Sequence, residues 1–183
     1  MFTGRWSVDL ACSTSQQALL RAMGKPSWQI SLVDKAREDF LLLEYTSETA
    51  QPCFEKDVRM FLDSDFLAFI SALIHVPVNE ISYRHVFRVQ EHKQHWPEDS
   101  KGFGDCESLT TFPSPDCFII RWYLKCGVMK AVHTVSGDTF TMQITLTTKS
   151  GQTSATKLYR RAPLSAQDLK RIADLKETAT ARR

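Results

Sequence analysis

The sequence lacks the short motifs by which the common classes of enzyme are recognised. It has no Gly-x-Ser-x-Gly nucleophile turn, no phosphate-binding P-loop and no Gly-x-Gly-x-x-Gly dinucleotide fingerprint. His92 and His95 stand close together, but no convincing third ligand accompanies them, so a metal site is not expected. We therefore expect no catalytic residue, no metal ion and no cofactor, and we expect a protein that is not an enzyme.

Features of exported, membrane-spanning and nucleic-acid-binding proteins are also missing. No apolar run reaches the roughly 20 residues that a membrane-spanning helix needs, and residues 1–5 hold no apolar signal segment. The five cysteines are odd in number and no two form a Cys-x-x-Cys pair, which predicts free thiols in a reducing compartment. A net charge of +2 is too small to predict nucleic-acid binding. These observations predict a cytoplasmic protein.

Strand-like segments dominate what is present. A series of short strands is predicted over residues 5–10, 28–33, 40–45, 81–89, 107–112, 117–125, 128–135, 139–148 and 153–161. Several of them alternate apolar and polar residues, whereas residues 40–45 are a denser apolar run. Residues 34–37 are expected to turn a hairpin between the second and third of these strands, whereas residues 46–62 fit no pattern clearly. Short strands joined by turn signals at regular spacing are typical of an antiparallel barrel or sandwich.

Three helical patterns interrupt or follow the strands. One covers residues 13–23, and the clearest covers residues 64–74, where five apolar side chains form a single stripe. The third begins at Ser165, which forms a capping-box variant with Asp168. We therefore divide the chain into a barrel over residues 1–163 and a basic helical tail over residues 164–183.

Several segments, in the same order, resemble the intracellular lipid-binding proteins, the fatty-acid- and retinoid-binding family of the calycin superfamily. They are Phe2-Thr3-Gly4-Arg5-Trp6, Lys25-Pro26-Ser27-Trp28, Asn79-Glu80-Ile81-Ser82 and Lys157-Leu158-Tyr159, which are similar to the first strand, the beginning of the second, the start of the fourth and the closing Arg-x-Tyr of that family. The resemblance implies a mostly β fold, an antiparallel up-and-down barrel of about ten strands whose first and last strands pair around a cavity. It also implies that Trp6 plugs one end of the barrel beneath a cation from the last strand, either Arg160 or Arg161.

The chain departs from this family in its helices. Family members have two lid helices between the first two strands, whereas residues 11–27 have room for only one by the sequence pattern. In exchange, an insertion over residues 49–78 separates the expected third and fourth strands. We consider three roles for the helix over residues 64–74. It replaces the missing lid helix, it packs on the outside of the barrel, or it forms a docking face for a protein partner or a membrane surface. The basic tail is a second candidate docking surface.

The expected ligand site departs from the family as well. Family members that bind fatty acids hold the carboxylate with two arginines and a tyrosine. Here Lys157 and Tyr159 lie two residues apart and so point to the same side of their strand, but a lysine lacks the planar fork of an arginine. The second arginine position falls on Ala131 or Val132, and neither is a cation, so the usual carboxylate site is incomplete. Alternatively, Tyr159 bonds within the barrel and Lys157 balances a buried acid.

Two function hypotheses follow. The first is a non-enzymatic carrier that binds a fatty acid or another hydrophobic small molecule reversibly, with Lys157, Tyr159, His133 and Trp122 as ligand contacts. His133 is included because it adjoins the lost arginine position and can make a proton-dependent contact. The alternative is a structural or adaptor subunit of a larger assembly, in which the chain's own side chains fill the cavity.

Overall fold

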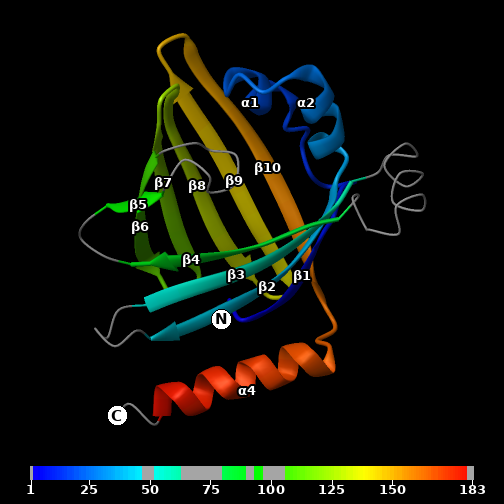
Figure 1. The fold of residues 1–183 in the computed structure, drawn as a ribbon, viewed down its shortest axis with the longest axis vertical. Helices are drawn as coiled ribbons and strands as arrows, with labels where there is room; N and C mark the ends of the chain where they lie inside the picture. Colours follow the sequence, from blue (N-terminus) through cyan, green and yellow to red (C-terminus); the bar gives the residue numbers. More distant parts are fainter. Residues whose placement is uncertain (1, 47–51, 63–79, 90–92, 97–105, 181–183) are drawn as a thin grey trace.

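Ten antiparallel strands form one continuous curled sheet in the computed structural model, which describes residues 2–46, 52–62, 80–89, 93–96 and 106–180. The strand order is β4-β3-β2-β1-β10-β9-β8-β7-β6-β5. Strands that are consecutive in the chain are paired, except that β4 and β5 form the two edges of the sheet, and β1 also pairs with β10. The strands are β1 (Gly4–Val8), β2 (Arg37–Thr46), β3 (Pro52–Phe61), β4 (Glu80–Arg88), β5 (Gln94–Trp96), β6 (Cys106–Ser114), β7 (Cys117–Leu124), β8 (Gly127–Ser136), β9 (Thr139–Thr148) and β10 (Gly151–Ala162). The predicted up-and-down barrel is confirmed (Figure 1).

The first and last strands, β1 and β10, lie side by side, as the sequence predicts. Trp6 stands opposite Arg161, and Val8 stands opposite Tyr159. Trp6 is fully buried and donates a hydrogen bond from Nε1 to the Phe2 carbonyl oxygen at 3.1 Å. The Arg161 guanidinium lies 4.3 Å from the centroid of the Trp6 ring, so Arg161 supplies the expected cation, an interaction worth about 0.5–2 kcal/mol. Arg160 instead pairs with Asp9.

Two helices separate β1 from β2, and the expectation of a single helix is wrong. They are α1 (Gln17–Ala22) and α2 (Ser27–Asp34), so the segment predicted as a strand over residues 28–33 is helical and no hairpin forms at residues 34–37. The physical reason is that Ile30 and Val33, one helical turn apart, face the barrel interior, while Trp28 is 67% exposed. Asp34, at the end of α2, accepts hydrogen bonds from Ser15 Oγ, Gln17 Nε2 and the Gln16 amide, which ties the two helices together.

The third strand also differs from the sequence prediction. The residues assigned to an insertion over 49–78 contain β3, which pairs with β2 along ten residues, from Arg37 opposite Phe61 to Thr46 opposite Pro52. The chain between β3 and β4 is therefore shorter than the predicted insertion. The predicted helix over residues 64–74 lies outside the described residues. Both α1 and α2 are present at one end of the barrel, so no lid helix is missing (Figure 1). The helix predicted over residues 64–74 is therefore not needed to replace one.

The C-terminal helix α4 (Ala166–Thr180) packs on the outside of the sheet, against β2 (Figure 1). This position explains the dense apolar run in β2, where Leu41 and Leu43 are buried as well as Phe40 and Leu42. A strand covered on both faces needs apolar residues at consecutive positions rather than at alternate ones. None of the helices in the described ranges is both long and apolar enough to cross a membrane.

Ion pairs hold α4 on the barrel. Arg5 Nε and Nη2 donate to the two Asp168 oxygens at 2.8 and 2.7 Å, and Arg171 pairs with Glu55 and Asp57. Asp168 also accepts from the Ser165 amide, and the Asp168 amide donates to Ser165 Oγ, which completes the predicted capping box. The hydrogen bonds from Arg5 hold the pKa of Asp168 well below its ordinary value.

Replacing Asp168 with alanine is expected to loosen α4 from the barrel. The change removes the carboxylate that accepts from Ser165 in the capping box and a partly buried bidentate ion pair with Arg5, which together stabilise docking by about 1–3 kcal/mol. Hydrogen exchange over residues 166–175 should accelerate in Asp168→Ala, and Lys170→Ala on the exposed side of α4 is the matched control. The pKa of Asp168 is lowered in the fold, so its stabilisation is present above about pH 4 and is lost as the pH falls further. Equal exchange in both variants would contradict this role.

Candidate functional site

A cavity of about 570 Å³ lies inside the barrel, beneath α1 and α2. Most of its wall is apolar, and the side chains come from both helices and from the inner faces of the strands. The apolar lining residues are Leu19, Leu20, Met23, Ile30, Val33, Leu42, Met60, Ile81, Phe87, Phe118, Trp122, Met129, Ala131, Phe140, Met142 and Ile144. Such a space suits an apolar ligand, since pockets of about 300–1,000 Å³ enclose most of a drug-sized molecule.

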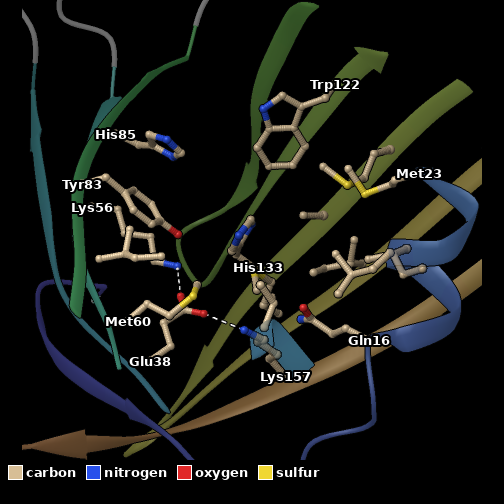
Figure 2. Close-up of a pocket in the computed structure, with 18 of the residues that line it drawn as sticks. Gln16, Met23, Glu38, Lys56, Met60, Tyr83, His85, Trp122, His133 and Lys157 are labelled. Atoms are coloured by element: carbon tan, nitrogen blue, oxygen red, sulfur yellow. Dashed lines mark hydrogen bonds and ion pairs between the residues drawn. The ribbon is translucent and has the colours of Figure 1, made fainter. Parts of the chain in front are cut away.

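Charged side chains gather at one place in this wall. Glu38 on β2 lies between Lys56 of β3 and Lys157 of β10, and its two oxygens accept from the lysine Nζ atoms at 2.9 and 2.7 Å (Figure 2). The three side chains are only 4–11% exposed. We call these three residues the charge cluster. Two ammonium groups face one carboxylate, so the cluster carries one excess positive charge in a wall that is mostly apolar.

The protonation states of the cluster follow from its geometry. Burial alone would raise the pKa of Glu38, but the charges of Lys157 and Lys56 outweigh it and hold the pKa well below its ordinary value. Burial lowers the pKa of Lys56, Glu38 raises it in part, and the like charge of Lys157 lowers it further. Glu38 is therefore ionised, and an added negative charge beside the cluster would favour the charged form of Lys56.

Three of the four residues named from the sequence line the cavity. Lys157, His133 and Trp122 contribute to its wall, and Figure 2 shows them on the same interior as Glu38 and Lys56. The pKa of His133 is lowered to about 3, first by burial and then by the charge of Lys56, with a partial offset from backbone carbonyl groups. His133 is therefore neutral at neutral pH.

Tyr159 shares the inner face with Lys157, as its spacing predicts, but is not among the described residues that line the cavity. Its ring is fully buried, with its centroid 4.8 Å from that of Phe40 and 5.6 Å from that of Phe140. Burial first, and then the negative charge of Glu38, raise the pKa of its hydroxyl well above the ordinary value. Lys56 Nζ lies 5.7 Å from the centroid of the Tyr159 ring, so Tyr159 is next to the charge cluster.

The sequence interpretation missed Glu38 and Lys56. Glu38 directly follows the segment predicted to be a turn, and Lys56 lies in the segment that fitted no pattern. A signal was nevertheless present, because Lys56 alternates with the buried residues Phe54 and Val58 and so lies on the inner face of β3. One of the sequence alternatives had Lys157 balancing a buried acid, and Glu38 is such an acid.

The stability of the protein is expected to fall in mild acid because His133 is buried in its neutral form. Its pKa is depressed in the fold, so the stabilisation is complete above about pH 6.5 and is lost as the pH falls toward about 3. Urea unfolding should show a loss of about 1 kcal/mol from His133 between about pH 6.5 and 5.5. The variant His133→Phe should lack that component, whereas exchange of the exposed His95 for glutamine should retain it. Parallel curves for His133→Phe and the wild type would contradict the assignment.

No family model and no curated protein matches the chain, but solved structures do. The fatty-acid-binding protein of Manduca sexta superposes with a TM-score of 0.61 at 12% identity, covering 87% of this chain and 99% of that one. A Schistosoma mansoni fatty acid binding protein in complex with arachidonic acid gives 0.60 at 14% identity, with 88% and 96% covered. The zebrafish ileal bile acid-binding protein complexed with cholic acid gives 0.54 at 9% identity, with 88% and 98% covered.

These similarities agree with the family resemblance of the sequence segments. Each superposition covers nearly the whole of the solved chain, while this chain has about an eighth of its residues left over. The protein therefore has the fold of the intracellular lipid-binding proteins, a ten-stranded barrel with two helices between its first two strands. At identities of 9–14%, the likeness establishes the fold and leaves the ligand to be argued from the cavity itself.

Proposed function

We propose that the protein is a non-enzymatic carrier that reversibly binds a fatty acid or a similar apolar molecule with one negative charge. The observation that carries this proposal is the charge cluster, which places one excess positive charge in the wall of an apolar cavity of about 570 Å³. A buried charge without a partner is unfavourable. A monoanionic ligand supplies the missing partner, and its apolar body fills the remaining space.

The binding energy has two parts. Burial of the apolar chain against the cavity wall contributes about 25 cal/mol per Å² of apolar surface removed from water. The charged head is oriented by Lys157 and Lys56, whose ammonium groups donate charge-assisted hydrogen bonds. Glu38 keeps these two groups together when no ligand is present and limits the net charge to one. A neutral ligand gains only the first part, and a dianion exceeds the available positive charge.

Direct detection of ligand tests the proposal. Native mass spectrometry of purified protein before and after delipidation should reveal a co-purified lipid, and a fluorescent fatty acid should bind the delipidated protein and be displaced by unlabelled fatty acid. Absence of both co-purified lipid and displaceable binding at micromolar ligand would contradict the carrier. That result would favour the alternative, in which the barrel is a scaffold of a larger assembly.

A further inference from the structure

His133 is a buried polar group in the cavity wall, and one of its two ring nitrogens is left unpaired by the part of the chain that the structure describes. It is 4% exposed and its ring stacks on Phe118, with centroids 4.2 Å apart and an interplanar angle of 5°. Its Nδ1 atom has no hydrogen-bond partner among the described residues. Buried polar side-chain atoms are rarely left unpaired, so an orphan atom in a cavity wall indicates a place where a polar group is expected.

The sheet register places His133 in line with the charge cluster. His133 on β8 stands opposite Met142 on β9, and Met142 stands opposite Lys157 on β10. Neighbouring strands lie about 4.8 Å apart, so the backbone positions of His133 and Lys157 are separated by about 10 Å across one inner face. All three side chains line the cavity. A ligand whose head lies at Lys157 and whose body occupies the cavity therefore passes close to His133.

The chemistry of this second position differs from that of the charge cluster. The ring is neutral, because burial and the nearby Lys56 oppose its protonation. A neutral imidazole has one donor nitrogen and one acceptor nitrogen. A hydroxyl group can donate to one or accept from the other, so it complements either tautomer. A second carboxylate would lack a cation at this point, and a purely hydrocarbon chain would leave Nδ1 unpaired.

We propose that His133 forms a second polar subsite and that the preferred ligand is a hydroxylated monoanionic amphiphile, such as a hydroxy fatty acid, with its hydroxyl within about 10 Å of the charged head. This inference rests on the proposed carrier function and specifies its ligand class. The stacking of His133 on Phe118 holds the ring in place, so the subsite is formed before the ligand arrives.

Competition binding with stearic acid and its monohydroxylated forms tests the subsite. The hydroxyl is placed near the carboxylate, at mid-chain or at the far end. Delipidated wild-type protein should bind the isomer whose hydroxyl reaches His133 about 3- to 10-fold more tightly than stearic acid, as expected for one additional hydrogen bond. His133→Phe should lose this preference for the hydroxy acid but bind stearic acid as the wild type does. His95 is exposed on β5, so His95→Gln should keep the preference.

Two further measurements keep the inference testable if His133→Phe folds poorly. His133→Gln retains a donor and an acceptor and should keep part of the preference. In the wild type, the imidazole nitrogen resonances of His133 should shift on addition of the preferred hydroxy acid more than on addition of stearic acid. Binding of stearic acid without any preference in the wild type, or an unchanged preference in His133→Phe, would overturn the subsite and leave the carrier intact. Failure of every acid to bind would overturn the carrier and the subsite with it.

Discussion

Replacement of Glu38 with glutamine is expected to lower the free energy of unfolding by about 3–5 kcal/mol, because it leaves two buried ammonium groups without a carboxylate. Urea denaturation at neutral pH measures the loss. The same change should tighten fatty-acid binding, since the ligand carboxylate then meets two unpaired cations. Stability and affinity therefore move in opposite directions, and saturating fatty acid should restore part of the lost stability.

The pH dependence distinguishes charge repulsion from a simple packing defect. Burial already lowers the pKa of Lys56, so raising the pH removes its positive charge and should reduce the cost of Glu38→Gln. Glu107→Gln is the matched control, since Glu107 pairs with Lys93 at the surface and exposed pairs contribute at most about 1 kcal/mol. If Glu38→Gln costs no more than Glu107→Gln, the charge cluster does not have the energetic role assigned to it.

Replacement of Lys157 with alanine is expected to weaken the binding of a fatty acid by about 10- to 100-fold, the loss of one hydrogen bond to a charged group. The remaining Glu38–Lys56 pair is neutral, so the charge cluster no longer carries an excess positive charge. The methyl ester of the same fatty acid should bind the wild type and Lys157→Ala with nearly equal affinity, because it depends on apolar burial alone. Isothermal titration calorimetry with the acid and the ester measures both.

A lysine on the outer face of the barrel provides the control for this variant. Lys130 on β8 is exposed, so Lys130→Ala should leave both affinities unchanged. Because Glu38 keeps one ammonium partner in Lys157→Ala, the variant should remain folded, and a urea titration verifies this. Equal loss of acid and ester binding would mean that Lys157 supports the fold of the cavity rather than the charged head of the ligand.

The sequence predicted the second half of the barrel well and the first half poorly, for a physical reason. From β6 to β10, one face of each strand meets the interior and the other meets solvent, so the alternation of residues is clear. In β2, α4 covers the outer face and removes the alternation. In α2, the eight residues are too few for their helical period to be told from a strand without knowledge of what they pack against.

Some residues of the candidate site could be predicted from spacing within one strand, whereas others come together only in the folded chain. Lys157 and Tyr159 could be placed on one face because they share a strand. Glu38, the partner of Lys157, is 119 residues away in the sequence, and it approaches Lys157 only because β1 brings β2 and β10 together. No spacing rule predicts that pair, so the sequence alone left open whether Lys157 has an acidic partner.

The pairing of β1 with β10 has a consequence for the order of events in folding. The contact between Arg5 and Ala162 closes a loop of almost the whole chain, and contacts of such high sequence separation make folding slow. Glu38 and Lys157 cannot meet before the last strand has been synthesised and has joined the first. The charge cluster therefore forms only when β1 pairs with β10, and a ribosome-bound chain without β10 lacks it.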